Sequence, residues 1–185
     1  MGKINVMETG IKDLLLIEPT VFNDKRGLFL ETFNEKDYRA VGIVEKLVQD
    51  NMSKSRQGVL RGLHFQVKYP QGKLVTVLSG KVFDVAVDLR KNSNTYGKWY
   101  GIVLSDDNMV QIYVPPGFAH GFLVLSEEAI LTYKCSEYYH PEDEAGLIWN
   151  DPSIGIKWPI PPDFQPVLID KDNKLGNLKE KKYEL

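Results

Sequence analysis

Two side chains that can bind anions or move protons interrupt an otherwise apolar segment, Leu60–Phe65. Arg61 carries a permanent cation, and His64 carries an imidazole, a side chain that suits proton transfer. Strict alternation along a strand would place these two side chains on opposite faces, whereas a bulge at Gly62 would bring them onto one face. The segment therefore predicts either a shared site or a hydrogen-bonded core histidine beside a surface arginine.

Two further polar side chains lie beside glycines. Lys73 follows Gln71-Gly72 and opens an apolar segment. Its ammonium group either discourages pairing at a sheet edge or, aimed into a cavity, stabilises negative charge that develops on an oxygen. His120 lies between Gly117 and Gly121 in a segment that begins with two prolines, and we expect a rigid turn there. His120 then either meets a ligand or bonds its own backbone.

The remaining candidates lie towards the C-terminus. Tyr133 and Cys135 share one face of an expected strand with Leu131. We expect Cys135 to be a small core residue without chemistry, and Tyr133 to be either a packed ring or a proton donor. His140 precedes a proline and is expected to be a turn residue. Other candidates are the rings of Tyr138 and Tyr139 for stacking, and the carboxylates of Asp170 and Asp172, which either orient an imidazole or form a solvated turn.

The elements that must position these groups are mostly strands. Residues 74–78 and 81–89, joined by Ser79-Gly80, predict a β-hairpin whose second arm alternates apolar residues with Asp84 and Asp88. Further strands are expected at 13–17, 28–33, 46–49, 59–65, 100–104, 110–114, 122–125 and 130–135. Many short strands separated by turns are typical of an all-β sandwich or barrel.

Helical signals are few. Asn34 is a suitable cap for a short helix over residues 35–40, and Gly42 can close it. From Tyr139 onward the chain is irregular and rich in proline, so we expect it to wrap the core, with a turn or two of helix near residues 170–175.

Length and composition exclude several classes of protein. The 185 residues fit a single domain over 1–185, without a linker or repeat. A net charge of -2 argues against a general binder of nucleic acid or of membrane surfaces. One cysteine excludes an intrachain disulfide framework and an all-cysteine metal site, and three histidines leave little material for a histidine-rich metal centre. No apolar targeting or membrane-spanning run is present, and we expect a cytoplasmic protein.

The nucleotide-binding fingerprints that rely on glycine-rich loops are absent from the sequence. A bound nucleotide would therefore be held by separate side chains.

An ordered set of motifs carries a family resemblance. Pro115-x-Gly117-x-x-His120 is similar to the second cupin motif. From about Leu14 to Asp172 the chain resembles the dTDP-4-dehydrorhamnose 3,5-epimerase family. The motifs are Asp24-x-Arg26-Gly27, Gln49-Asp50-Asn51, Leu60–Phe65, Gln71-Gly72-Lys73, Phe118–Phe122 and Tyr133-Lys134-Cys135. The resemblance implies a cupin jelly roll with few short helices.

The resemblance also implies an activity and catalytic residues. The family inverts C3 and C5 of a dTDP-linked 4-keto-6-deoxyhexose in dTDP-L-rhamnose biosynthesis, without a cofactor. His64 matches the general base, and Asp172 the carboxylate that orients it. Lys73 matches the cation beside the C4 oxygen, where enolate charge develops. Tyr133 matches the acid that reprotonates the opposite face.

Other matched positions are implied to bind substrate. Arg26 and Arg61 would hold the diphosphate, and His120 the sugar or its adjoining phosphate. Tyr139 would stack on thymine. Further contacts are implied for Glu31, Gln49, Asn51, Glu144 and Lys171. Family members are homodimers that exchange N-terminal strands, so Arg26 and Glu31 are expected to come from the partner chain.

Metal chemistry is not expected. Metal-binding cupins use a His-x-His pair and a glutamate seven residues before a glycine. This sequence has no His-x-His, and Lys73 stands seven residues before Gly80, where its cation disfavours a divalent ion. Two alternatives to the double epimerase remain: an epimerase that inverts one carbon of a related sugar nucleotide, and a cupin that binds a sugar nucleotide without catalysis.

Overall fold

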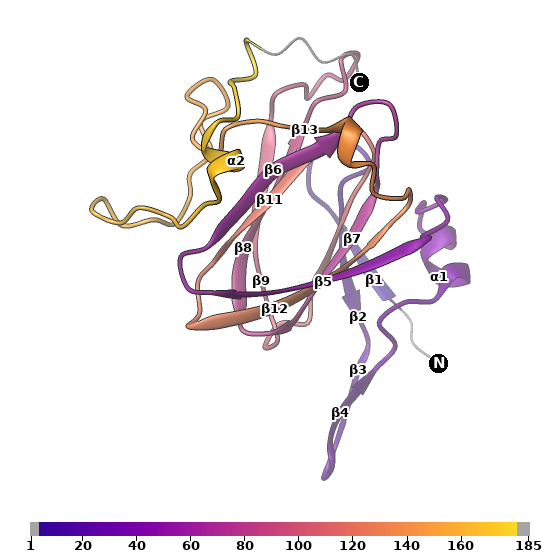
Figure 1. Ribbon diagram of the computed structural model, residues 1–185. Coiled ribbons are helices and arrows are strands. Elements are labelled where there is room, and N and C mark those ends of the chain that lie inside the picture. The colour runs from indigo at the N-terminus through magenta and orange to yellow at the C-terminus, as the bar shows by residue number, and fades with distance from the viewer. Residues whose placement is uncertain (1–3, 181–185) are drawn as a thin grey trace.

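Short alternating segments pair into two facing antiparallel sheets in the computed structural model, which describes residues 4–180 (Figure 1). The six-stranded sheet contains, in spatial order, β1 (Ile4–Glu8), β2 (Leu15–Pro19), β10 (Gln111–Val114), β7 (Lys73–Ser79), β12 (Glu128–Cys135) and β5 (Gln49–Arg56). The five-stranded sheet contains β13 (Glu144–Gly146), β6 (Leu60–Gln66), β11 (Phe118–Val124), β8 (Lys81–Asp88) and β9 (Trp99–Ser105). The predicted all-β jelly roll is confirmed.

The main core fills the space between the two sheets. Apolar residues of both sheets meet there, among them Val75 and Ile112 from one sheet and Val82 and Phe122 from the other. A second cluster lies on the opposite face of β8 and β11. Its members include Val85, Val87 and Ala119, packed against the C-terminal residues Leu147, Ile154 and Trp158. The C-terminal segment therefore covers the five-stranded sheet, as the sequence predicts.

The predicted hairpin over residues 74–89 is wrong. β7 pairs with β10 and β12, whereas β8 pairs with β11 and β9, so the two segments belong to different sheets. Gly80, with a φ of 79°, turns the chain from one sheet to the other. The Ser-Gly sequence predicts a sharp turn but carries no information about which neighbour each strand pairs with.

Two other expectations about strands need correction. His120 lies within β11 and not in a turn, because the strand already begins at Phe118. The strand expected at 46–49 is instead β5, which starts at Gln49 and continues to Arg56. Its residues are nearly all polar, so hydrophobic alternation does not reveal it.

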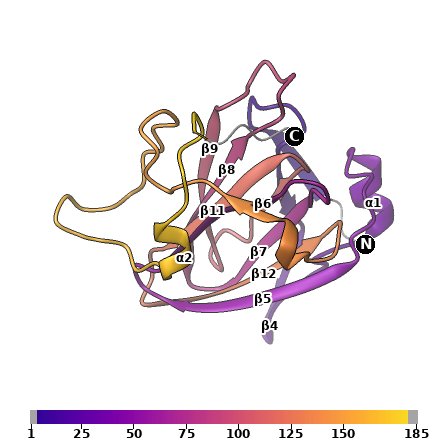
Figure 2. The same cartoon turned by 45° about the horizontal axis from the view of Figure 1, so that its top comes forward.

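The predicted helices are confirmed. α1 spans Glu35–Ala40, and the side-chain oxygen of Asn34 accepts a hydrogen bond from the Lys36 backbone N–H at 3.1 Å. α2 is short, Asp170–Asn173, and lies beside β6 in both ribbon views (Figures 1 and 2). A 3₁₀ turn, Pro141–Asp143, precedes β13. No helix among residues 4–180 has the length and apolar character needed to cross a membrane.

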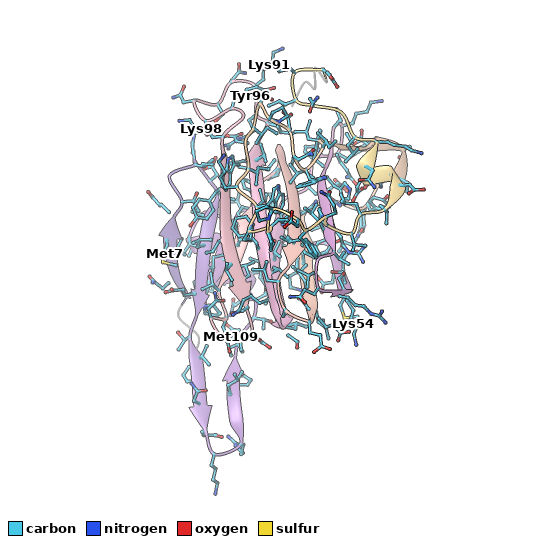
Figure 3. All side chains as sticks on the ribbon, turned by 90° about the vertical axis from the view of Figure 1, so that its left-hand side faces the viewer. Met7, Lys54, Lys91, Tyr96, Lys98 and Met109 are labelled. Atoms are coloured by element: carbon cyan, nitrogen blue, oxygen red, sulfur yellow. The ribbon has the colours of Figure 1, made fainter. Side chains whose placement is uncertain are left out.

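One hairpin projects from the body of the molecule. Within the described part of the chain, β3 (Val21–Asp24) and β4 (Gly27–Leu30) pair only with each other, and they extend away from both sheets (Figures 1 and 3). Three large apolar side chains on it are exposed: Phe22, Leu28 and Phe29, the last at 64%. An isolated two-stranded hairpin with exposed apolar side chains has little stability of its own in water.

Candidate active site

β6 departs from regular alternation at Gly62. The backbone of Gly62 has a φ of 122°, the Gly62–Leu63 peptide bond is cis, and the register between β6 and β11 shifts nearby. A Cβ on Gly62 would lie 2.6 Å from the Cα of Gly121, so only glycine fits at this approach of the two strands. Arg61 and His64 both line one cavity, so the irregularity expected near Gly62 is present and places the two side chains on the same face.

Most of the candidate residues line two adjoining cavities. The first cavity has a volume of about 420 Å³ and the second about 320 Å³. Both are lined by His64, Lys73 and Tyr133. The first also contains Arg61, His120 and Asp172, and the second Gln49, Asn51, Tyr139 and Glu144. Because β6 and β11 belong to one sheet and β5, β7 and β12 to the other, functional groups face this space from both sheets.

His64 is held by a buried carboxylate. Its Nε2 lies 2.8 Å from Oδ1 of Asp172, whose Oδ2 accepts a hydrogen bond from the Gly62 backbone N–H at 3.3 Å. Asp172 is 1% exposed and comes from α2, 108 residues away from His64. Burial by itself would raise the pKa of Asp172, but the bonds from His64 and Gly62 outweigh it and hold that pKa below its usual value.

This arrangement makes the stability of the fold depend on pH through Asp172. Because its pKa is lower in the folded chain, the ionised carboxylate stabilises the folded state fully above about pH 5. That contribution falls as the pH drops through the unfolded value of about 3.9. At pH 7 we expect Asp172→Asn to lower the free energy of unfolding by about 1–3 kcal/mol, the range for hydrogen bonds to charged groups.

Urea unfolding of both proteins at pH 7, 5 and 3.5 measures this dependence. The difference between wild type and Asp172→Asn should shrink towards pH 3.5. A difference that stays constant or grows on acidification would show that the carboxylate charge does not stabilise the fold.

Lys73 and Tyr133 project from neighbouring strands of the six-stranded sheet. Burial lowers the pKa of Lys73, and the negative groups around it, among them Asp84 and Glu144, offset part of that effect. Burial also raises the pKa of Tyr133 above its ordinary value of about 10, so its hydroxyl keeps its proton at neutral pH. The cavity therefore contains a buried lysine amine, whose charged form the nearby acids favour and burial disfavours, and a protonated phenol opposite the imidazole of His64.

A second histidine–carboxylate pair lies beside the first. His120 is the cross-strand partner of His64, and its Nε2 lies 2.9 Å from both carboxylate oxygens of Asp84. Asp84 is fully buried on the cavity side of β8. Asp84 alternates with apolar residues in the sequence but is not among the site residues that the sequence predicts. A carboxylate at the centre of an otherwise apolar strand was the available signal, because it must find a partner inside the fold.

Side chains of the second cavity are connected to one another. The hydroxyl of Tyr139 donates to Glu144 Oε2 at 2.8 Å, and the same oxygen lies 2.6 Å from Lys171 Nζ. The Tyr139 backbone N–H donates to the side chain of Gln49 at 2.9 Å. The half-exposed ring of Tyr139 is thus fixed at the rim beside His64.

Some predicted residues lie elsewhere. Arg26 is at the tip of the projecting hairpin, where its guanidinium pairs with Asp24 and its side chain is 83% exposed. Neither Arg26 nor Glu31 lines either cavity of this chain. Cys135 is buried, as expected. His140 stacks on Tyr69 with ring centroids 4.1 Å apart and precedes the 3₁₀ turn. Among residues 4–180, no group of three or more histidine, cysteine, aspartate or glutamate side chains could hold a metal ion.

Comparison with known proteins identifies relatives over nearly the whole chain. A family model described as dTDP-4-dehydrorhamnose 3,5-epimerase matches residues 8–180. The curated dTDP-4-dehydrorhamnose 3,5-epimerase of Methanothermobacter thermautotrophicus is 51% identical over 180 residues, which cover 97% of each chain.

Solved structures give the same result for the fold. A dTDP-6-deoxy-D-glucose-3,5-epimerase from Legionella pneumophila, in complex with dTDP-4-keto-L-rhamnose, is similar with a TM-score of 0.92 and 48% identity, covering 96% of this chain and 94% of that one. A 3'-monoepimerase from Streptomyces bikiniensis, in complex with dTDP-quinovose, is similar with a TM-score of 0.85 and 31% identity. The match covers 92% of this chain and 86% of that one.

Proposed function

The chain belongs to the dTDP-4-dehydrorhamnose 3,5-epimerase family, and we propose that it inverts C3 and C5 of dTDP-4-keto-6-deoxy-D-glucose by proton transfer between its own side chains. The product is dTDP-4-keto-L-rhamnose. The observation that carries this proposal is the placement of the His64–Asp172 pair on one side of a cavity and Tyr133 on the other, with Lys73 beside it.

His64 acts as the base in this proposal. When its Nε2 carries the hydrogen that Asp172 accepts, Nδ1 holds a lone pair and takes the proton from the carbon next to the C4 ketone. The carboxylate of Asp172 fixes the orientation of the ring and stabilises the imidazolium that forms.

Lys73 stabilises the intermediate. As the proton leaves, the electrons of the C–H bond move into the C3–C4 or C4–C5 bond, and negative charge collects on the C4 oxygen. An ammonium group beside that oxygen binds the enolate more strongly than the ketone, so it lowers the barrier to proton removal.

Tyr133 completes the inversion. It belongs to the sheet that faces His64, and burial keeps its hydroxyl protonated. It donates this proton to the opposite face of the carbon, and the C4 ketone re-forms. Exchange with water then removes the proton from His64 and restores the one on Tyr133.

The remaining cavity residues bind the nucleotide part of the substrate. Arg61, fixed by Ser55 Oγ at 3.1 Å from its Nε, holds the diphosphate, and His120 contacts the sugar or its adjoining phosphate. The half-exposed ring of Tyr139 stacks on thymine. Further polar contacts come from Gln49, Asn51, Glu144 and Lys171, which line or border the second cavity.

The active unit is a homodimer in this proposal, with exchanged N-terminal strands. The exposed apolar side chains of the β3–β4 hairpin and its extension away from the body support a second copy as its partner. In such a dimer, Arg26 and Glu31 reach the partner's cavity. The cytoplasmic location that the sequence suggests stays a prediction.

Isotope exchange tests the reaction directly. The protein is incubated with dTDP-4-keto-6-deoxy-D-glucose in deuterium oxide, and deuterons are counted and located in the recovered sugar by mass spectrometry. Exchange at both C3 and C5 is expected. Exchange at one carbon would instead identify a mono-epimerase, the activity named for the relative at 31% identity. Absence of exchange beyond a protein-free control would leave only a non-catalytic binding protein.

A further inference from the structure

The inner face of β5 presents four polar side chains to the space between the sheets. Residues 49, 51, 53 and 55 alternate with outward-facing ones along this strand. The hydroxyl of Ser55 accepts a hydrogen bond from Arg61, and the amide of Asn51 donates to the sulfur of Cys135 at 3.5 Å. Ser53 differs from both, because its Oγ is buried and finds no hydrogen-bond partner within residues 4–180.

A buried hydroxyl without a partner destabilises the protein that contains it. Alanine would fill nearly the same space at position 53 without leaving a polar atom unpaired. The cross-strand neighbour of Ser53 is Leu131, which has no polar side-chain atom to offer. Packing among residues 4–180 therefore does not account for the hydroxyl of Ser53, whereas a ligand that brings its own oxygen would.

Ser53 lies where such a ligand is expected. It lines the first cavity together with Arg61 and Tyr133. Along β5, Asn51 is the cross-strand partner of Tyr133, which lies at the reacting carbons, and Ser55 is bonded to Arg61, which lies at the diphosphate. Ser53 is between Asn51 and Ser55, so it lies between the reacting carbons and the diphosphate. Rotation about its Cα–Cβ bond moves Oγ among three staggered positions.

The sugar group between these two positions is identified by its chemistry. In a hexose joined to the diphosphate through C1 and reacting at C3, the intervening carbon is C2, which carries a hydroxyl. We propose that Ser53 Oγ hydrogen-bonds this C2 hydroxyl and so fixes the sugar ring relative to His64 and Tyr133. The inference rests on the proposed function and adds a specificity-determining residue to it.

The test compares Ser53→Ala with wild type in both binding and stability. We expect the KM for dTDP-4-keto-6-deoxy-D-glucose to rise about tenfold, the effect of losing one uncharged hydrogen bond. The Kd for dTDP, which lacks the hexose, should not change. The melting temperature should stay equal or rise, because the variant no longer buries an unpaired hydroxyl. Ser79→Ala, at an exposed serine at the end of β7, is the matched control and should leave all three values unchanged.

A 2-deoxy analogue of the substrate identifies the hydroxyl concerned. The wild type should bind this analogue about tenfold more weakly than the substrate, and Ser53→Ala should not distinguish the two. Ser53→Cys, which keeps the side-chain size with a weaker hydrogen-bonding group, gives a second measurement if the alanine variant folds poorly.

Three results would overturn the role of Ser53. They are an unchanged KM in Ser53→Ala, a loss of affinity for dTDP in that variant equal to the loss for the substrate, or equal binding of the substrate and its 2-deoxy analogue by wild type. They differ from failure of the proposed function. A wild-type protein without isotope exchange removes that function, whereas an active wild type with an unaffected Ser53→Ala variant removes only the contact.

Discussion

His64→Asn is expected to lower kcat for dTDP-4-keto-6-deoxy-D-glucose by a factor of about 10²–10⁴, the usual contribution of a general base. Deuterium exchange should fall equally at C3 and C5, because both protons are next to the same ketone and are taken by the same imidazole. Asparagine suits the test because it is polar and smaller than histidine, so it fits the cavity and provides no group that accepts a proton at neutral pH; the Gly62 backbone N–H still donates to Asp172.

The control for this variant is His140→Asn. The side chain of His140 stacks on Tyr69 and lies outside both cavities. The His140→Asn variant should therefore turn over substrate at a rate near that of wild type. Rates are measured by product formation and by mass-spectrometric exchange. If His64→Asn retains more than about a tenth of the wild-type rate, another group removes the proton, and the assignment of His64 as the base fails.

Tyr133→Phe is expected to separate proton removal from inversion. The variant keeps the ring and loses the proton donor, so product formation should fall by about 10²–10⁴. His64 can still remove a proton, exchange it with water and return it to the same face. Substrate recovered from deuterium oxide should therefore contain deuterium while keeping its original configuration.

This outcome discriminates between two roles for Tyr133. If Tyr133 were needed only for packing, the variant would change the rate of deuterium exchange and the rate of inversion by the same factor. Tyr96→Phe, at an exposed tyrosine in the loop between β8 and β9, is the control, and both of its rates should match wild type (Figure 3). Inversion at the wild-type rate in Tyr133→Phe would assign the second proton transfer to another group.

The His64→Asn and Tyr133→Phe variants also distinguish a double epimerase from a mono-epimerase and from a non-catalytic binding protein. A cupin that only binds a sugar nucleotide would show no exchange in wild type or in either variant. A mono-epimerase would show the same dependence on His64 and Tyr133 but would incorporate deuterium at one carbon only. The positions of exchange, and not the loss of activity, therefore decide between single and double epimerisation.

Local signals in the sequence were reliable where one or a few neighbouring residues decide the structure. Asn34 caps α1 as predicted, because the bond it makes reaches only to Lys36. The irregularity at Gly62 was recognised as one of two alternatives, because a strand with Arg61 and His64 three residues apart needs it to place both on one face.

Local signals failed where pairing depends on distant parts of the chain. The turn at Ser79-Gly80 has the sequence of a hairpin, yet β7 and β8 join different sheets because each is already paired on both edges by other strands. β5 was placed wrongly because its polar side chains face a cavity, so it lacks the apolar alternation of a strand packed on a core.

The sequence by itself determined the fold class, the family and the identity of most candidate residues, because ordered motifs and alternating apolar residues are properties of the chain read locally. The resemblance already matched Asp172 with His64, but only the tertiary structure showed the contact between them. It alone paired Asp84 with His120 and left Ser53 Oγ without a hydrogen-bond partner among residues 4–180. These contacts join residues up to 108 positions apart, and their existence depends on the packing of two sheets and the wrapping of the C-terminal segment around them.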